Sequence, residues 1–142
     1  CDLIVAAESA KFGIAEVKRG LVAAGGGLVR LPRQITPRLA MELALTGDFV
    51  DAQRAYEMGL INRVVPTGEA LAGAKELAAK IAANGPLAVA VSKRIITESA
   101  DWSTSEQFAK QGEYANPVFG SADAMEGATA FAEKRAPNWT GK

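Results

Sequence analysis

Residues 11–31, KFGIAEVKRGLVAAGGGLVRL, form the most informative segment of the chain. It places one carboxylate, Glu16, upstream of a loop that ends in three consecutive glycines, Gly25, Gly26 and Gly27, with an apolar run directly after them. Glycine loses much backbone entropy on folding, so three together indicate a main chain that turns with φ > 0 or approaches another group closely. A carboxylate ahead of such a loop is a natural place for proton transfer beside exposed backbone amides.

Outward from this stretch, apolar and turn residues divide the chain into short elements. Apolar and β-branched residues predict strands over residues 3–7, about 10–14 and 61–65. The apolar residues 28–31 predict a short helical segment that ends near Pro32. Two further helices carry an N-cap signal at the start and a glycine just past the end. These signals predict helices over residues 37–46 and 52–58, capped by Thr36 and Asp51 and stopped by Gly47 and Gly59.

From about residue 69 the chain is predicted to be helical, with breaks near residues 84–86, Ser103 and residues 116–117. A few strands followed by helices indicate an α-rich α/β chain with a small sheet. Many core-facing positions are alanine, so such helices bury little area alone, which is compatible with oligomerisation. Residues at helical spacing predict one apolar face on the first of these helices: Leu71, Ala74, Leu77, Ala78 and Ile81.

Composition excludes several classes of function. The chain is 49% hydrophobic and 23% charged, which is typical of a globular protein. Sixteen basic and sixteen acidic side chains give no net charge, so nothing favours nucleic acid or a membrane surface as partner. A single cysteine makes no internal disulfide and fits a reducing compartment. The absence of histidine removes the usual zinc sites and the Ser-His-Asp triad, so we expect no metal and assign acid–base chemistry to carboxylates, Lys, Tyr or Cys.

Four motifs share one resemblance. CDLIVAAESAKFGIAEVKRGL, residues 1–21, looks like a strand, turn and strand that lead into a catalytic glutamate, and TG-x(3)-DA-x(2)-A-x(3)-GL-x-N-x-V-x-P, residues 46–66, is specific. PLAVAVSKRIITES, residues 86–99, and DAMEGATAFAEKR, residues 123–135, complete the set. Together they resemble the second half of the crotonase, or enoyl-CoA hydratase/isomerase, superfamily over essentially all 142 residues.

The resemblance implies an α/β fold of ClpP/crotonase type. Residues 1–66 would form the C-terminal part of the crotonase core, and residues 67–142 a helical oligomerisation region that builds a homotrimer or hexamer. The chain begins without Met inside an apolar strand pattern. We interpret this start as that of a fragment, with roughly the first half of the domain preceding Cys1.

The resemblance also assigns a catalytic role to Glu16, as the second of two glutamates that hold a water between them. Burial and neighbours push the pKa values of two such carboxylates apart, so one serves as base and the other as acid. The simpler interpretation is an exposed ion pair with Lys18 or Arg19, worth only about 0–1 kcal/mol. One departure from the family concerns Ala15, which replaces a common proline and loosens the backbone that holds Glu16.

Five positions are assigned to acyl-CoA binding by the same resemblance. The loop residues Ala24, Gly25 and Gly26 would skirt the acyl chain and offer main-chain N–H groups, although alanine stands where the family commonly has glycine and resists φ > 0. Phe131 and Lys134, three apart on a predicted helix face, would lie near the coenzyme A nucleotide, often that of a neighbouring subunit. An aromatic face and an ammonium suit an adenine ring and a phosphate. The alternative is a core aromatic and a solvated lysine.

The function implied is that of a cytoplasmic enoyl-CoA hydratase of β-oxidation type, a lyase whose substrate is an acyl-CoA thioester and which needs no cofactor. The family's two oxyanion-hole amides come from the part preceding Cys1, so these residues alone should be inactive. Two alternatives stay open. One is an enoyl-CoA isomerase, which needs a single carboxylate, and the other is a non-catalytic crotonase-like protein for acyl-CoA binding or assembly.

Overall fold

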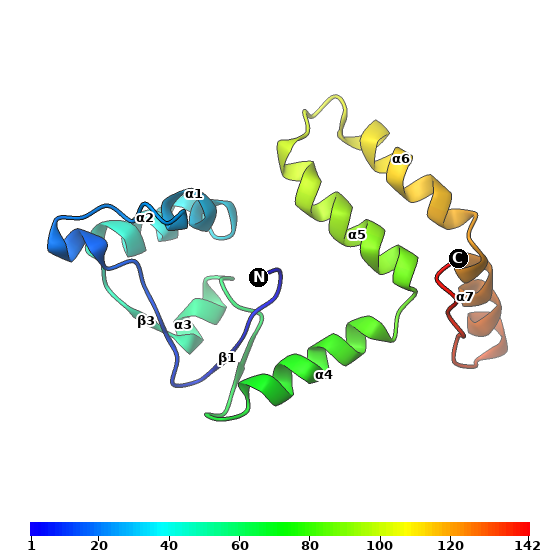
Figure 1. The fold of residues 1–142 in the computed structure, drawn as a ribbon, viewed down its shortest axis with the longest axis horizontal. Helices are drawn as coiled ribbons and strands as arrows, with labels where there is room; N and C mark the ends of the chain where they lie inside the picture. Colours follow the sequence, from blue (N-terminus) through cyan, green and yellow to red (C-terminus); the bar gives the residue numbers. More distant parts are fainter. The chain divides into compact units, whose positions relative to one another are not determined.

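The computed structural model describes all 142 residues, which form two compact units, Cys1–Leu77 and Ala78–Lys142 (Figure 1). Short strands lie in the first unit, and helices make up the second. No helix has the length and apolar character needed to cross a bilayer. In chain order the elements are β1 (Val5–Ala7), β2 (Lys11–Phe12), the 3₁₀ helix η1 (Glu16–Arg19), α1 (Gly27–Arg30), η2 (Leu31–Arg33), α2 (Pro37–Thr46), β3 (Val50–Asp51), α3 (Ala52–Glu57), β4 (Arg63–Val65), α4 (Ala70–Ala82), α5 (Pro86–Glu98), η3 (Ser99–Asp101), α6 (Gln107–Phe119) and α7 (Ala122–Glu133).

Two pairs of strands organise the first unit. β1 pairs in parallel with β4, with Val5 opposite Arg63, and β2 pairs antiparallel with β3, with Lys11 opposite Asp51. A parallel pair needs a long crossover, and here the crossover carries α1, α2 and α3. The strand predicted over residues 10–14 is shorter in the structure, where β2 covers only Lys11–Phe12. The chain leaves the β2–β3 pair at Gly13, where the Phe49 ring leaves no room for a side chain.

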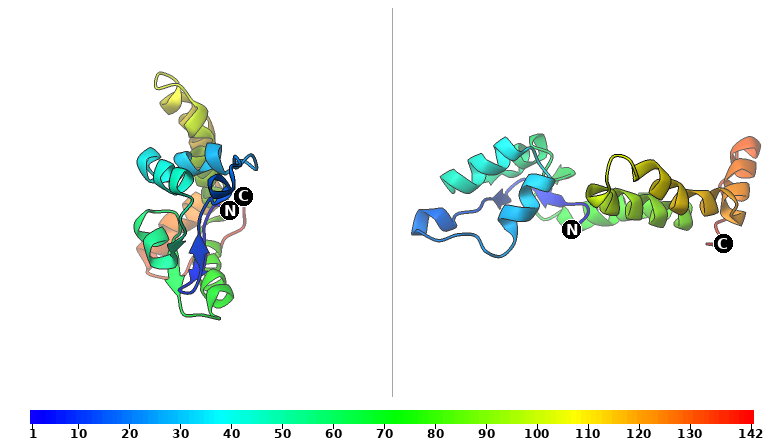
Figure 2. Two further views of the ribbon diagram at one scale, coloured as in Figure 1. Left: turned by 90° about the vertical axis from the view of Figure 1, so that its left-hand side faces the viewer. Right: turned by 90° about the horizontal axis from the view of Figure 1, so that it is seen from above.

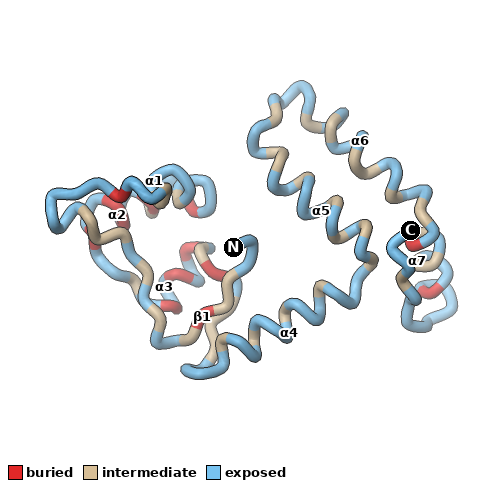
Figure 3. The backbone as a smooth tube through the Cα atoms, viewed as in Figure 1, coloured by how far each residue is buried: buried red, intermediate tan, exposed pale blue.

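The core of the first unit consists of two small apolar clusters. Ala52 and Ala55 of α3 are completely buried, which lets that helix approach β1 and β4 closely. Figure 3 shows buried segments on α2 and α3, whereas α4, α5 and α6 contain none. The clusters are Ala6, Ala52, Ala55 and Ile61, and Ile35, Ala40, Leu43 and Met58.

The predicted caps of the first unit are confirmed. Asp51 accepts a hydrogen bond from the Arg54 N–H at 2.7 Å and starts α3. Gly47 and Gly59 are left-handed, with φ of 66° and 78°, and end α2 and α3. Thr36 precedes α2 as predicted, although its side chain makes no capping hydrogen bond.

In the second unit α5 and α6 run side by side, as Figures 1 and 2 show. The Arg94 guanidinium lies over the Tyr114 ring, 4.1 Å from its centroid, and its Nε donates to Glu98 at 2.8 Å. The Tyr114 hydroxyl also donates to Glu98, and its ring stacks on Trp102 at 5.9 Å between centroids. A hydrogen-bonded polar group thus joins the two helices where no side chain is fully buried.

Trp139 holds the C-terminal tail within this unit. Its indole Nε1 donates to the Ala83 carbonyl at 2.9 Å. Its ring lies against Gly85 and Gly127, where an added Cβ would stand 3.6 Å and 3.2 Å from ring atoms. The absence of side chains at these two glycines therefore makes the space that the indole fills.

One expectation about the later helices is wrong. The break predicted at residues 116–117 is absent, since α6 continues through Pro117 to Phe119 and the chain turns at Gly120. A proline in the last turn removes only one intrahelical hydrogen bond, so the helix tolerates it there. The apolar face predicted on α4 is largely open in this chain, since Leu71 is 68% exposed and the helix has no buried residue.

Candidate functional site

Glu16 is the first residue of η1 and follows closely on β2, so a short strand and a 3₁₀ turn set its position. Its side chain is half-buried, and its backbone carbonyl accepts from the Leu21 N–H at 3.1 Å. The ion-pair interpretation is wrong, because no ion pair joins Glu16 to Lys18 or Arg19. Lys18 instead pairs with Asp48, Nζ to Oδ1, at 2.6 Å. The Glu16 carboxylate is therefore not neutralised by its neighbours in sequence.

The glycine-rich loop turns at one residue. Among its three glycines only Gly26 has a positive φ, 95°, and it stands at the N-cap of α1. Ala24 does not need a positive φ, so the departure from glycine at that position causes no strain. The Ala24 N–H donates to the Val22 carbonyl at 2.8 Å, which closes a three-residue turn. In this structure that amide is used within the loop.

Arg30 braces the same loop from α1, and sequence analysis did not single it out. Its Nη1 donates to the Gly25 carbonyl at 3.4 Å. A Cβ built on Gly26 would stand 2.8 Å from that nitrogen. The signal for this contact is the spacing of four residues between Gly26 and Arg30, which places the arginine one helical turn beyond the loop.

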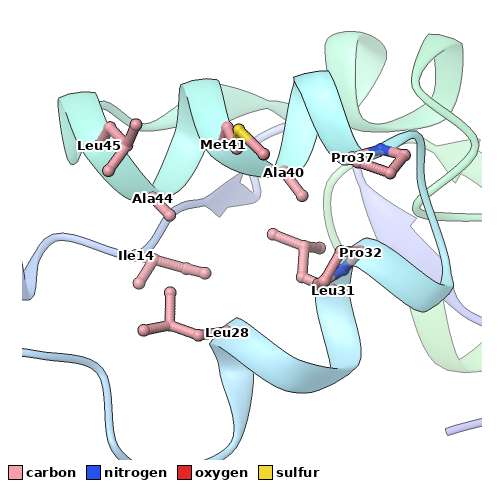
Figure 4. Close-up of a pocket in the computed structure, with 9 residues that line it drawn as sticks. All are labelled: Ile14, Leu28, Leu31, Pro32, Pro37, Ala40, Met41, Ala44 and Leu45. Carbon is pink, nitrogen blue, oxygen red and sulfur yellow. The ribbon is translucent and has the colours of Figure 1, made fainter.

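An apolar groove of about 270 Å³ lies beside the loop (Figure 4). Ile14, two residues before Glu16, and Leu28, directly after the glycines, point toward each other below α2, and Ile14 approaches within 3.5 Å of a Cβ built on Gly27. The segment before Glu16 and the loop after it are thus in contact. Glu16 itself does not line the groove. Its walls are Ile14, Leu28, Leu31, Pro32, Pro37, Ala40, Met41, Ala44 and Leu45.

The groove was not predicted, although its signal is present in the sequence. Ala40, Met41, Ala44 and Leu45 recur at helical spacing along α2 and form one apolar stripe. Two of the four, Met41 and Leu45, are exposed. A second hollow of about 280 Å³ shares Ile14 and Leu31 with the first and includes Gly27 and Arg30.

Phe131 and Lys134 lie in the second unit, whereas Glu16 and the loop lie in the first. Phe131 is 88% exposed, so its interpretation as a core aromatic is wrong. Lys134 is not on a helix face with Phe131, because α7 ends at Glu133 and Lys134 takes a left-handed conformation with φ of 55°. The chain reverses at this point, and the helical spacing expected from AFAEKR ends one residue too early.

Charged groups next to Lys134 are strongly coupled. Arg135 donates from both Nη atoms to Glu126, at 2.6 and 2.9 Å, and from Nε to Glu133 at 2.6 Å. The hydrogen bond from Arg135, followed by that from the Asn138 N–H, lowers the pKa of Glu126 to about 2. The same pairs raise the pKa of Arg135 further above its ordinary value. No three His, Cys, Asp or Glu side chains come together in a way that would hold a metal ion.

The fold and these residues define a class of protein. Over residues 1–142 the chain matches the family described as Enoyl-CoA hydratase/isomerase, and it belongs to this family. It is 53% identical over 138 residues to enoyl-CoA hydratase EchA19 of Mycobacterium tuberculosis, across 97% of this chain and 52% of that relative. It is 39% identical over 145 residues to carnitinyl-CoA dehydratase of Proteus mirabilis, across 99% of this chain and 56% of that protein.

Solved structures agree with the family. A crystal structure of enoyl-CoA hydratase from Mycobacterium tuberculosis H37Rv superposes with a TM-score of 0.94 at 60% identity, covering 100% of this chain and 56% of that one. Enoyl-CoA hydratase from Bacillus anthracis gives 0.94 at 38% identity, covering 100% and 55%. The chain therefore has part of a crotonase fold and spans about half the length of the relatives it matches.

Proposed function

We propose that the intact protein is an enoyl-CoA hydratase, a lyase that adds water across the double bond of an α,β-unsaturated acyl-CoA. The observation that carries this proposal is the environment of the Glu16 carboxylate. Glu16 is half-buried, makes no ion pair and begins the 3₁₀ helix η1. The segment just before it contacts the glycine loop through Ile14. The names of the relatives support the reaction class.

The chemistry needs two proton transfers. The water oxygen bonds to Cβ of the acyl group as one carboxylate takes a water proton, and a carboxyl group delivers a proton to Cα. Glu16 supplies one member of this pair. The second carboxylate and the two amides that stabilise the thioester enolate come from the preceding half of the family's domain, so the 142 residues alone are inactive. The reaction uses neither metal nor cofactor, and acyl-CoA is the substrate.

Binding and assembly belong to the same proposal. The loop Ala24, Gly25 and Gly26 contacts the acyl end, and Phe131 and Lys134 contact the nucleotide. The intact protein is a homotrimer or hexamer, because the second unit exposes large apolar side chains that a partner chain would bury. They are Ile96, Phe108, Phe119, Met125 and Phe131. The lone thiol of Cys1 is compatible with a cytoplasmic location.

The test is Glu16→Gln in the intact protein, which keeps the size of the side chain and removes proton transfer. We expect the hydration rate to fall at least ~10²-fold while acyl-CoA affinity changes little. Glu8→Gln is the matched control, because the Glu8 carboxylate only accepts a hydrogen bond from the Thr67 N–H at 3.3 Å. Normal turnover by Glu16→Gln would contradict the catalytic assignment. No turnover by the unaltered protein would favour a non-catalytic acyl-CoA-binding or assembly protein.

A second candidate follows from the relative named carnitinyl-CoA dehydratase, at 39% identity. Dehydration is hydration in reverse, so the same carboxylate pair serves both. Comparing rates on a short enoyl-CoA and on carnitinyl-CoA separates the two substrates. For the enoyl-CoA isomerase alternative, the residue at the first glutamate position decides, because shifting a double bond needs only one carboxylate.

A further inference from the structure

Lys134 has an unusual backbone. It is the only residue other than glycine with a positive φ, and its φ of 55° and ψ of 38° put it in the left-handed region. Helices commonly end with such a residue, and it is usually glycine, because a Cβ disfavours this conformation. A disfavoured conformation that the surroundings enforce is a reason to look for a use of that side chain.

The contacts that enforce this conformation come from both sides of Lys134. The Arg135 N–H donates to the Ala130 carbonyl at 3.0 Å and the Lys134 N–H to the Phe131 carbonyl at 3.3 Å, the paired bonds of a Schellman motif. The Arg135 side chain, directly after the turn, forms ion pairs with Glu133, directly before the turn, and with Glu126 of α7. The turn is thus clamped by one guanidinium.

The same turn sends the chain back along α7. Asp123, 4% exposed, accepts from the Thr140 N–H and hydroxyl and from the Gly141 N–H, at 2.7 to 2.9 Å. Glu126 also accepts from the Asn138 N–H at 2.7 Å. Two roles are therefore possible for Arg135: docking this tail, or fixing Lys134 for a ligand.

The charge distribution favours a ligand. Two glutamates neutralise Arg135, whereas the Lys134 ammonium makes no ion pair with any carboxylate of the chain. The Phe131 ring, 88% exposed, precedes it by three residues. An unneutralised ammonium and an open aromatic face, both on the same clamped turn, match a nucleotide that carries a phosphate.

We propose that Arg135 is a positioning residue for acyl-CoA binding, which acts by holding Lys134 in the left-handed conformation that directs its ammonium to a phosphate of the coenzyme A nucleotide. This inference rests on the proposed function, which puts the nucleotide beside Phe131 and Lys134. Arg135 itself does not touch the ligand, because both edges of its guanidinium are occupied by carboxylates.

A double-mutant cycle on the intact protein tests the inference, with coenzyme A and butyryl-CoA as probes in calorimetric titrations. Lys134→Gln should weaken binding roughly tenfold by removing a charged phosphate contact. Arg135→Gln should weaken it about threefold to tenfold in the unaltered protein and not at all in the Lys134→Gln background, because coupled residues are not additive. Glu133→Gln, which removes one Arg135 contact, should act in the same direction with a smaller effect and serves if Arg135→Gln does not fold.

Arg94→Gln is the control, since it breaks a comparable network with Glu98 and Tyr114 elsewhere in the same unit and should leave affinity unchanged. Equal losses from Arg135→Gln in both backgrounds, or a loss from Arg94→Gln of the same size, would show a structural role only and overturn the inference alone. Unchanged binding by Lys134→Gln would overturn both the inference and the nucleotide assignment. The hydratase assignment would still rest on Glu16.

Discussion

The two units of the chain are stabilised in different ways. Ten of the eleven buried apolar residues lie in Cys1–Leu77, and only Ala130 lies in Ala78–Lys142. The second unit instead has two polar networks, one around Arg94 and one around Arg135. Both units leave some large apolar side chains exposed, among them Leu45 in the first and Phe108 in the second. Apolar burial holds the first unit together, and directional hydrogen bonds give the second its internal geometry.

This difference means that the two units depend to different degrees on apolar burial within the chain. Helices whose apolar surface is left open gain stability only when another surface covers it. Polar networks within the second unit join α5 to α6 and hold the turn after α7. In the first unit, Ile14 contacts the glycine loop through the apolar groove below α2.

The largest difference should appear when a core side chain is truncated in each unit. Leu43→Ala, in the buried face of α2, should lower the free energy of unfolding of the 142-residue chain by about 2–5 kcal/mol. Phe108→Ala in α6, where the ring is 75% exposed, should change it by no more than about 0.5 kcal/mol. Urea denaturation measures both. Similar losses would mean that Phe108 is packed within the chain and that the two units are stabilised alike.

A backbone effect of intermediate size is expected within the first unit. Gly26→Ala should cost about 1–2 kcal/mol, because φ there is 95°. Gly25→Ala is the matched control and should be close to neutral, since that glycine has neither a positive φ nor an atom within 4 Å of an added Cβ. Denaturation midpoints compare the two. Equal effects would show that the loop's path does not depend on Gly26.

The second unit should be the more sensitive to acid. The pKa of Glu126 is about 2 in the folded chain and about 4.3 when unfolded, so its stabilising contribution is complete above pH 4.3 and is lost as pH falls toward 2. The pKa of Asp123 is lowered too, chiefly by the Thr140 backbone hydrogen bond, and acts in the same direction. The protection of the Thr140 and Gly141 amides against exchange, corrected for the intrinsic pH dependence of exchange, should therefore fall across this window before that of the first unit's core. Glu126→Gln should flatten the response, and simultaneous loss in both units would contradict it.

The smallest expected effect is a gain. Lys134→Gly should stabilise the intact protein by about 1 kcal/mol, because glycine accepts the left-handed conformation without strain. Lys134→Ala removes the same ammonium but keeps the Cβ, so it should give no such gain. Thermal denaturation of both variants measures the difference. Equal stability of the Gly and Ala variants would mean that φ is relaxed at this position.

The parts of the fold that local chemistry decides could be predicted from the sequence. The ends of α2 and α3 follow from Asp51, Gly47 and Gly59, whose roles need only neighbouring residues. The turn at Lys134 could not be predicted, because an unfavourable local conformation is stabilised by Glu126, nine residues away from Arg135. The continuation of α6 through Pro117 could not be predicted either. The energetic cost of a proline depends on its position in the helix, and the sequence alone does not show that α6 ends at Phe119.

The candidate site divides in the same manner. Glu16 and the glycines stand out in the sequence by their spacing, but the catalytic role of Glu16 is implied only by the family resemblance, since an isolated carboxylate carries no local mark of catalysis. The expectation that the three glycines include a turn with φ > 0 is confirmed at Gly26. The groove under α2 and the clamp by Arg135 arise from contacts between segments distant in sequence, of which a single sequence shows only the apolar spacing and the charges.

Because Trp139 packs against Gly85 and Gly127, its fluorescence reports whether the C-terminal tail is docked. The chain has two tryptophans, and they lie in different surroundings: Trp139 on the tail, bonded to Ala83, and Trp102 stacked on Tyr114. In a Trp102→Phe background the remaining tryptophan fluorescence comes from Trp139 on the tail alone. Its emission moves to longer wavelength when the indole leaves its seat for water. Release of the tail can therefore be followed in real time without any added dye.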